Sequence, residues 1–407
     1  MEKKRFYSSE LCARCKGRGY CGGPCKILNK IKQLQPKVKK EFTGSSPPEI
    51  FVGRFDYPNI NTGILSPEQQ GEMGKLASPE QWYKEKAEID DILSFRSQMI
   101  YSRFKTNIKK SKGKLIGTLK EISIAKKSVL TEFKLKKKPY VNFSLSKHTP
   151  FIGNPAPLVS ARLEENPFIE KKVDYVTGDK HARAVDGIKE MYKGKIQTSS
   201  IIKILSAGML GRAINRRFVP TRWSITAVDD TLSKFLLERI RYYQEIDEII
   251  VFHNEYLGNH YEFLLLPGKF EFEVIEAYMT GSVWNPSGRV ALAQDNEGFF
   301  GRKKYAKNVT GAYYTARLAV CEFLEKIKRQ ASVLVLREER PEYYAPLGVG
   351  ILRECGRDAF NKKEQKFESL GDVFNAISHR MKIPIDVFKK NSKLLKEYGK
   401  QKRLSDF

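Results

Sequence analysis

Four cysteines near the start of the chain constrain its fold more tightly than any other feature. Cys12, Cys15, Cys21 and Cys25 lie in "CARCKGRGYCGGPC", a C-x2-C pair followed after five residues by a C-x3-C pair. Four thiolates at this spacing can surround Zn2+ tetrahedrally, and the intervening glycines allow the tight turns required. A module of this size buries too little apolar surface to fold alone. Metal binding would therefore supply its folding free energy. The sequence therefore predicts a four-cysteine zinc module over residues 1–30.

Two other roles fit the same cysteines. An iron–sulfur cluster also takes four thiolate ligands, and this spacing does not exclude one. A redox disulfide would suit the C-x2-C pair, but the sequence around it lacks a thioredoxin-like βαβ pattern. Arg14, Lys16 and Arg18 lie inside the cluster, so we expect the module to contact phosphate groups.

The net charge of +26 is concentrated in three segments. Lys and Arg outnumber Asp and Glu by 12 to 4 in residues 1–50, by 14 to 2 in 102–147 and by 9 to 3 in 380–407, which accounts for the whole excess. Segregated positive charge is typical of proteins that bind a polyanion, most often nucleic acid. The alternative is a solvated lysine-rich surface, which also serves thermostability.

Membrane insertion is not expected. No apolar run approaches the roughly 18 residues that span a bilayer, and the first residues lack the hydrophobic core of a signal peptide. We therefore expect a cytoplasmic, nucleoid-associated protein with no membrane partner.

The order of segments predicts a mixed α/β (α+β) fold, with the zinc module followed by a large two-part core of mixed sheet and helices. The expected divisions are a basic linker at 31–49, an N-terminal α/β core at 50–265, a mainly helical C-terminal core at 266–390 and a basic flexible tail at 391–407. Helices are expected over 184–214, with a break near Gly194, and after Gly311; strands are expected over 248–253, 260–266 and 270–278.

Alternation in "VLTEFKLKKK" predicts a strand with one buried and one basic face. Val129, Thr131, Phe133 and Leu135 would point inward, while the residues between them would point to solvent. The candidate nucleic-acid contacts of this segment are Lys134, Lys136 and Lys137.

A second basic stretch, "GRAINRRFVPTRWSITAVDD", combines arginines, an indole and two carboxylates. Arg216 and Arg217 are candidate phosphate contacts. Arg222, Asp229 and Asp230 are candidate catalytic residues, because paired carboxylates suit a divalent metal. The alternative is structural: Asp229 or Asp230 begins a helix as its N-cap, Trp223 is core, and the arginines form ion pairs.

The segment "FEFEVIEAY" provides the last catalytic candidate, Glu276, which would act only if it faced a cleft. Its alternation of Phe270, Phe272 and Val274 with Glu271 and Glu273 predicts a strand with one buried face. No P-loop, GxSxG or GxGxxG motif is present, so whether the protein is an enzyme stays open from its residues.

The chain ends in "QKRLSDF", in which Gln401, Leu404 and Phe407 follow the pattern Q-x-x-L-x-x-F. On one tight helical turn Leu404 and Phe407 would project together as an apolar anchor, with Gln401 free to form hydrogen bonds. This pattern resembles the peptide that binds the PCNA sliding clamp, although the chain stops before a second aromatic residue.

Six ordered stretches carry a wider resemblance: "LCARCKGRGYCGGPC", "FVGRFDYPNINTGILSP", "SAGMLGRAINRRFVPTRWSITAVDD", "YLGNHYEFLLLPGKFEFEVIEAY", "GAYYTARLAVCEFLEK" and "PLGVGILRE". With them the chain resembles the archaeal Nre family of DNA repair proteins over nearly its whole length. The resemblance implies a role in the repair of DNA damage with a sliding clamp as partner, and no particular enzymatic activity.

These observations lead to one functional prediction and two alternatives. The prediction is a DNA-repair-associated protein that binds damaged or replicating DNA through basic segments and reaches the PCNA clamp through its C-terminal box. The alternatives are a metal-dependent enzyme of the nuclease or transferase type, acting on nucleic acid or nucleotides, and an RNA-binding protein.

Overall fold

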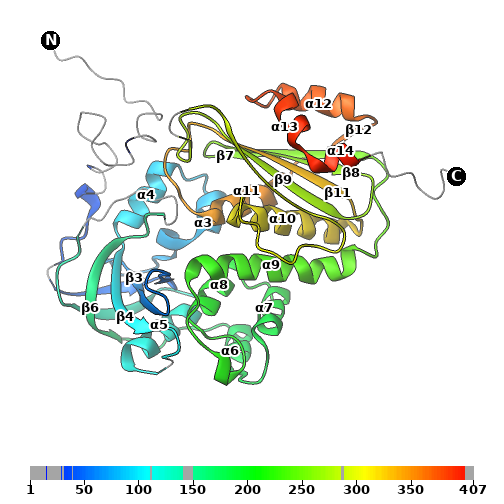
Figure 1. Ribbon diagram of the computed structural model, residues 1–407. Coiled ribbons are helices and arrows are strands. Elements are labelled where there is room, and N and C mark those ends of the chain that lie inside the picture. Colours follow the sequence, from blue (N-terminus) through cyan, green and yellow to red (C-terminus); the bar gives the residue numbers. More distant parts are fainter. Residues whose placement is uncertain are drawn as a thin grey trace, which may run out of the picture. The chain divides into compact units, whose positions relative to one another are not determined.

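The computed structural model describes residues 15, 29, 32–38, 40–110, 112–140, 150–285 and 288–398 (Figure 1). The chain divides into two compact units. We call Gly22–Leu232 the N-terminal unit, and Ser233–Phe407 together with Met1–Cys21 the C-terminal unit. Each unit contains a six-stranded sheet with helices, so the predicted mixed α/β class is confirmed.

The sheet of the N-terminal unit has the strand order β1-β5-β6-β4-β3-β2. All neighbours in it are antiparallel except β4 and β6, which run parallel. The elements of this unit are β1 (Glu41–Ser46), β2 (Ile50–Val52), β3 (Asn59–Ser66), η1 (Gly74–Ala77), α3 (Pro79–Lys84), α4 (Ile89–Ser97), β4 (Ile100–Asn107), α5 (Lys114–Ile124), β5 (Val129–Leu135), β6 (Asn154–Leu163), α6 (Lys171–Gly178), α7 (Ala184–Lys193), α8 (Thr198–Ser206), η2 (Ala213–Asn215) and the first part of α9 (Thr221–Ile240).

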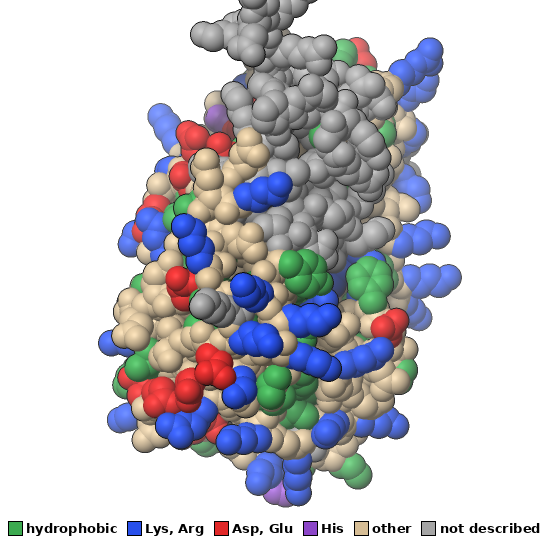
Figure 2. Space-filling model, turned by 90° about the vertical axis from the view of Figure 1, so that its left-hand side faces the viewer, with side chains coloured by type: hydrophobic (Ala, Val, Ile, Leu, Met, Phe, Trp, Pro, Cys, Tyr) green, Lys and Arg blue, Asp and Glu red, His purple; other side chains and the backbone are tan. Residues whose placement is uncertain are grey.

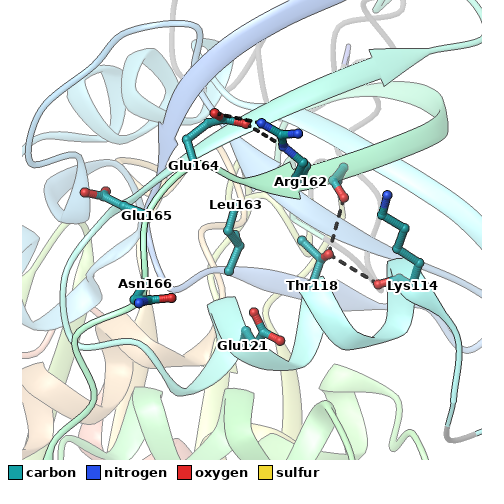
Figure 3. Close-up of a pocket in the computed structure, with 9 residues that line it drawn as sticks. Lys114, Thr118, Glu121, Arg162, Leu163, Glu164, Glu165 and Asn166 are labelled. Atoms are coloured by element: carbon teal, nitrogen blue, oxygen red, sulfur yellow. Dashed lines mark hydrogen bonds and ion pairs between the residues drawn. The ribbon is translucent and has the colours of Figure 1, made fainter.

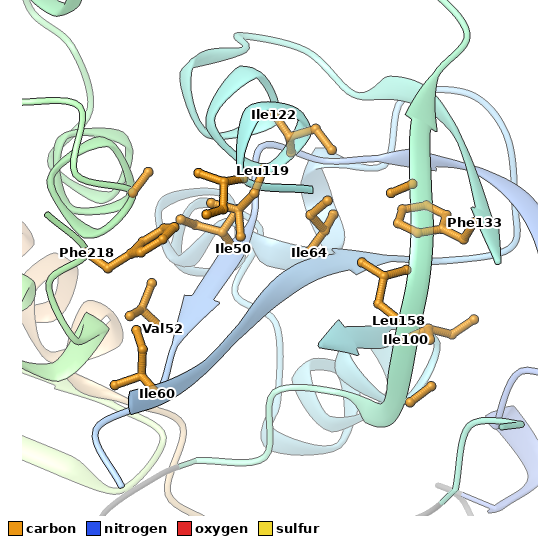
Figure 4. Close-up of a cluster of buried hydrophobic side chains, with 14 of the residues drawn as sticks. Ile50, Val52, Ile60, Ile64, Ile100, Leu119, Ile122, Phe133, Leu158 and Phe218 are labelled. Carbon is orange, nitrogen blue, oxygen red and sulfur yellow. The ribbon is translucent and has the colours of Figure 1, made fainter. Parts of the chain in front are cut away.

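One face of this sheet packs on helix α5 to form the hydrophobic core (Figure 4). The predicted alternation in β5 is confirmed, because Val129, Thr131, Phe133 and Leu135 are buried while Glu132 and Lys134 are exposed. Phe133 stacks on Phe42 of the neighbouring strand with 4.7 Å between ring centroids. On the opposite face, a second hydrophobic cluster that includes Leu65, Leu76 and Tyr101 covers one part, and charged side chains such as Lys134 occupy another.

The sheet of the C-terminal unit has the order β10-β9-β11-β8-β7-β12, with β9 and β11 parallel and the other neighbours antiparallel. Its elements are β7 (Ile249–Tyr256), β8 (Asn259–Leu266), β9 (Glu271–Tyr278), β10 (Ala291–Glu297), α10 (Gly311–Ile327), β11 (Ser332–Glu339), α11 (Val349–Ala359), β12 (Gln365–Phe367), α12 (Leu370–Ser378), α13 (Ile385–Asn391) and α14 (Lys393–Glu397). Within this unit, α10 and α11 lie on one side of the sheet and α12, α13 and α14 on the other (Figure 1).

Coverage on both sides buries the central strands completely. All residues of β8 and β11 are buried, and in β9 only the two end residues are partly exposed. The expectation that β9 has one solvated face is therefore wrong, because Glu273 and Glu276 are buried with exposed fractions of 0 % and 2 %. Helices cover both faces of this strand, so its glutamates are buried, although the sequence pattern suggests that they face solvent.

The division between the units differs from the expected one at 265/266. It falls between Leu232 and Ser233, inside α9. A boundary at 265/266 would separate β8 from β11, although these strands pair along their whole length. The region expected to be mainly helical, 266–390, also supplies β9, β10, β11 and β12 to that sheet.

Helix α9 starts earlier than the sequence indicated. It begins at Thr221, directly after Pro220, so Asp229 and Asp230 lie two turns inside the helix, and the N-cap expectation is wrong. The predicted break near Gly194 is confirmed between α7 and α8. None of the helices in the described ranges is long and apolar enough to cross a lipid bilayer.

Candidate nucleic-acid interface

Part of the outer face of the N-terminal sheet, opposite the core formed with α5, is basic, and another part is covered by a second hydrophobic cluster that includes Leu65 and Tyr101. On β4, Phe104 points to the core while Arg103 and Lys105 point away from it. Figure 2 shows the side of the molecule on which β3, β4 and β6 lie, where Lys and Arg side chains are interspersed with hydrophobic ones. The Arg103 guanidinium donates to the hydroxyl of Tyr140 at 3.1 Å, and the Tyr140 side chain is 45 % exposed. This face therefore offers cations with an aromatic ring beside them.

A cluster of exposed aromatic side chains lies next to these cations. The loop between β2 and β3 presents Phe55 and Tyr57, and the first turn of α9 presents Trp223; they are 65 %, 47 % and 44 % exposed. The rings of Tyr57 and Trp223 are 5.1 Å apart at 54°. The interpretation of Trp223 as a core residue is therefore wrong, and we call Phe55, Tyr57 and Trp223 the aromatic platform.

Two contacts join the platform to the strands of the sheet, and a third lies within its loop. The Val52 amide donates to Thr221 Oγ1 at 2.9 Å, which joins β2 to the start of α9. Lys105 Nζ lies 3.3 Å from the Asp56 carboxylate, so the loop that carries Phe55 and Tyr57 reaches the outer face of β4. The Arg54 guanidinium lies 5.5 Å from the centroid of the Phe55 ring. Stacking surfaces and cations thus adjoin in one place.

The predicted nucleic-acid contacts in the described ranges have different surroundings. Lys134, Lys136 and Lys137 are all exposed, with Lys134 Nζ 2.8 Å from Glu41. Arg216 instead donates to the carbonyls of Gly211, Thr177 and Asp179, so its guanidinium holds the loop after α8. Arg217 beside it is exposed.

Other predicted site residues lie outside the described residues. These are Cys12, Cys21, Cys25, Arg14, Lys16, Arg18, Gln401, Leu404 and Phe407. Cys15 belongs to the described part and is buried, with 3 % of its surface exposed.

The four catalytic candidates do not share a unit. Arg222, Asp229 and Asp230 lie on the part of α9 that belongs to the N-terminal unit, whereas Glu276 lies on β9 of the C-terminal unit. Asp229 is buried, and Arg222 and Asp230 are partly exposed. Across the ranges that the structure describes, no three His, Cys, Asp or Glu side chains are grouped so that they could hold a metal ion.

Glu276 belongs to a buried charge cluster that sequence reasoning missed. Its carboxylate contacts the Arg337 guanidinium and accepts from the Tyr278 hydroxyl at 2.7 Å. Arg337 also contacts Asn259 and lies 3.3 Å from Glu339. Burial raises the pKa of Glu339 to about 7, against the opposing effect of Arg337. The register that pairs β11 with β9 creates this cluster, and no local sequence signal reports such a register.

A second buried group surrounds His260, on the strand next to β11. Its Nε2 lies 2.9 Å from Glu262, and its Nδ1 lies 3.5 Å from Glu255. Burial alone would lower the pKa of His260, but the carboxylates of Glu255 and Glu262 outweigh burial and raise it. His253 lies on the neighbouring strand, as the sequence predicted, with the turn at Gly258 between the two strands.

A shallow pocket of about 430 Å³ lies between α5 and the end of β6 (Figure 3). Lys114, Thr118, Glu121, Ala161, Arg162, Leu163, Glu164, Glu165 and Asn166 line it. Arg162 forms a two-pronged ion pair with Glu164 at 3.0 and 3.3 Å. Because three glutamates line it beside Lys114 and an already paired Arg162, this pocket suits a polyanion less well than the basic part of β4.

Comparison with known proteins identifies the family. Residues 20–285 match the family model described as archaeal Nre, N-terminal, and residues 297–407 match archaeal Nre, C-terminal. The chain is 36 % identical over 395 residues to DNA repair protein NreA of Haloferax volcanii, covering 94 % of this chain and 93 % of the relative. It is 34 % identical over 398 residues to DNA repair protein NreB of Archaeoglobus fulgidus, covering 97 % and 99 %.

A further relative, DNA repair protein NreA of Archaeoglobus fulgidus, is 34 % identical over 383 residues, covering 92 % of this chain and 94 % of the relative. No solved structure matches the chain. Two adjoining family models and relatives that align over nearly their full lengths confirm the resemblance found in the sequence, and the chain belongs to the archaeal Nre family.

Proposed function

We propose that this protein acts in DNA repair by binding nucleic acid on the outer face of its N-terminal sheet. Unpaired bases would stack on Tyr57 and Trp223, while Arg54, Arg103 and Lys105 would contact phosphates. The observation that carries the proposal is the exposed ring pair of Tyr57 and Trp223 beside the cations of β4. The names of the three relatives, all DNA repair proteins, support the biological context.

The two kinds of contact would contribute differently. Stacking of one base on an aromatic side chain is worth about 1–3 kcal/mol and is tolerant of sequence. Phosphate contacts release counterions, so each one steepens the salt dependence by about 0.7 for a single strand. The Lys105–Asp56 pair is exposed, so Lys105 can exchange that partner for a phosphate at little cost. We therefore expect single-stranded nucleic acid to bind with little sequence preference and strong salt dependence.

The test is the affinity of the full-length chain for a fluorescent single-stranded oligonucleotide at several salt concentrations. Replacing Tyr57 or Trp223 by alanine should weaken binding about 5-fold to 150-fold and leave the salt slope unchanged, because stacking releases no counterions. Arg103→Ala should lower the slope itself. The matched control is Tyr175→Ala, since Tyr175 is 68 % exposed on α6 and lies beside Lys172 and Asp174.

Unchanged affinity in both platform variants would contradict this site, and a flat salt profile of the unaltered chain would contradict nucleic-acid binding altogether. Comparison of DNA with RNA of the same sequence separates repair from the RNA-binding alternative. Tighter binding of RNA would favour the latter.

We propose in addition that the C-terminal box recruits the protein to the PCNA sliding clamp. Gln401, Leu404 and Phe407 would insert into the clamp as one turn of helix. The pattern of these residues supports this, together with the basic residues Lys400, Lys402 and Arg403 around them.

We propose that Cys12, Cys15, Cys21 and Cys25 bind Zn2+. A set of four thiolates suits this ion, and the burial of Cys15 fits a ligand enclosed by protein. Elemental analysis of the purified chain should find one zinc per molecule, and Cys15→Ser should lose it. Iron in place of zinc, with absorption in the visible range, would support the iron–sulfur alternative.

A further inference from the structure

The loop between β10 and α10, in the C-terminal unit, carries an aromatic side chain at the tip of a tight turn. The Gly301 amide donates to the Gly298 carbonyl at 2.8 Å, which closes a four-residue turn with Phe299 and Phe300 in its middle. Gly301 has a φ of +77°, a conformation that favours glycine. Phe300 is 93 % exposed. Because burial is what makes a phenylalanine stabilising, the fold gains little from Phe300 at this position, and its ring is available to a ligand.

Packing and hydrogen bonds hold this turn in place. The Phe299 ring meets Phe300 edge-on at 5.3 Å, and the cations of Arg241 and Lys269 lie 5.7 and 5.9 Å from its centroid. Arg302 donates to the carbonyls of Lys304 and Tyr305 at 2.8 and 3.2 Å. Phe300 is therefore presented by an ordered loop, and ligand binding would incur little loss of conformational entropy there.

A carboxylate below the turn completes its support. Asp295 pairs with Arg302 at 2.9 Å and also accepts from the amides of Asn308 and Val309, each at 2.9 Å. Glu297 next to it is buried against Arg317. Both carboxylates are thus buried and fully engaged, so they do not neutralise the surface of the loop.

The loop that carries Phe300 has basic side chains and no acidic ones. Residues 298–307 contain Arg302, Lys303, Lys304 and Lys307 and no acidic residue. The three lysines are exposed, and none of them is an ion-pair partner among the contacts of the described residues. An apolar tip followed by lysines without ion-pair partners complements a ligand whose apolar layers lie next to phosphates, which is the arrangement of stacked base pairs in duplex DNA.

We propose that Phe300 is an intercalating wedge, which enters a base step of duplex DNA and kinks it while Lys303, Lys304 and Lys307 contact the phosphates on either side. The choice of DNA as the ligand rests on the proposed function. The site itself is a loop of the C-terminal unit, separate from the aromatic platform of the N-terminal unit. Partial unstacking by such wedges bends a duplex by roughly 20–90°. The protein would then contact nucleic acid at a second site, which distorts double-stranded DNA.

The experiment measures bending of a short duplex labelled at its ends with a donor and an acceptor dye, using the full-length chain at saturation. The unaltered protein should raise the energy transfer between the ends. Phe300→Ser should abolish that rise and weaken duplex binding about 5-fold or more, whereas Phe300→Leu should keep part of the rise because leucine can also enter a base step. The matched control is Phe168→Ala, a phenylalanine that is 60 % exposed with Lys127 at 5.9 Å from its ring.

The lysines provide a separate readout. Lys303→Gln combined with Lys304→Gln should reduce the salt slope of duplex binding by about 2 and leave the energy transfer at saturation unchanged. Equal energy transfer for the unaltered chain and Phe300→Ser would overturn the wedge. So would Phe300-dependent binding to anionic lipid vesicles with no effect of Phe300→Ser on duplex binding, which would assign the tip to a membrane surface.

The single-strand measurements distinguish the two proposals. Loss of single-strand binding in the Trp223→Ala variant with no effect of Phe300→Ser on bending would retain the platform and overturn the wedge. The reverse pattern would support the wedge and contradict the platform. No binding of any nucleic acid by the unaltered chain would overturn both.

Discussion

Glu339 makes the folding stability of the C-terminal unit depend on pH. One buried arginine, Arg337, serves the two buried carboxylates of Glu276 and Glu339, and Glu339 also accepts from the Trp284 amide at 3.2 Å. Burial raises the pKa of Glu339 from 4.5 to about 7. The folded protein therefore keeps this proton between about pH 4.5 and 7, where the unfolded chain has released it. A stabilising contribution present in acid is thus lost as the pH rises through this window.

Replacing Glu339 by glutamine should remove that dependence. Glutamine resembles the protonated carboxyl group but does not titrate, so the free energy of unfolding of the variant should fall less between pH 5 and 7 than that of the unaltered chain. The difference in slope should reach up to about 1.4 kcal/mol per pH unit. Urea unfolding at a series of pH values measures both profiles, and parallel profiles would show that Glu339 titrates alike in both states.

The partners of buried charged residues could not be predicted from the sequence. The sequence offered Glu276 as a catalytic candidate on the condition that its carboxylate faces a cleft. It could not show that Arg337 lies opposite, since the parallel register of β11 and β9 joins segments far apart in the chain. Tyr57 and Trp223 are a similar case, because each has an ordinary local sequence and only the fold brings the rings together.

Helix α14 is held to the sheet by one carboxylate of β9. Glu273 accepts from Ser392 Oγ at 2.5 Å, from the Lys393 amide at 2.9 Å and from the Leu394 amide at 3.0 Å. A helix of five residues has few internal hydrogen bonds, so these contacts to its first turn decide whether it stays folded. Glu273 therefore positions the last described helix before the C-terminal box.

Glu273→Ala should release α14 without unfolding the sheet around it. Hydrogen–deuterium exchange should become faster over residues 393–397, where the carboxylate and its contacts to the backbone amides are lost. The control is Asp386→Ala on the neighbouring helix, whose 82 % exposed carboxylate pairs with exposed Lys389. Unchanged exchange over 393–397 would mean that the apolar contacts of Leu394 suffice to hold the helix.

Elements with strong periodicity were predicted well, and those governed by distant packing were not. The strands β5, β7 and β8 and the helix α10 agree with the sequence, because each shows its period over a whole element. The start of α9 was placed too late, although Pro220 directly before Thr221 is a helix-start signal. The acidic pair at Asp229 and Asp230 resembles an N-cap, so the sequence contains two competing local signals, and the helix begins at the one set by Pro220.

One of the three basic segments of the chain forms strands of the N-terminal sheet. The basic segment at 102–147 contributes Arg103 and Lys105 from β4 and Lys134 and Lys136 at β5, and both strands belong to one sheet. Composition alone predicts a polyanion as ligand. Which basic residues share a face can be seen only from the order of strands in the sheet. The proposed wedge at Phe300 belongs to the other unit, so the proposed contacts with nucleic acid are spread over both units.

Clamp recruitment should be separable from nucleic-acid binding in the full-length chain. Removing Gln401–Phe407 should abolish binding to a PCNA sliding clamp in calorimetry, where we expect a dissociation constant of about 1 µM for the unaltered chain, because ordering a peptide on binding offsets part of its contact energy. The same truncation should leave single-strand affinity nearly unchanged, since the aromatic platform and the cations of β4 remain.

Single substitutions refine this comparison. Leu404→Ala and Phe407→Ala should each weaken clamp binding at least tenfold, because each removes an apolar anchor. Ser405→Ala, at a position that the box leaves open, is the matched control. Clamp affinity that survives both the truncation and the two anchor substitutions would refute the box as the recruiting element and assign clamp contact, if any, to the folded units.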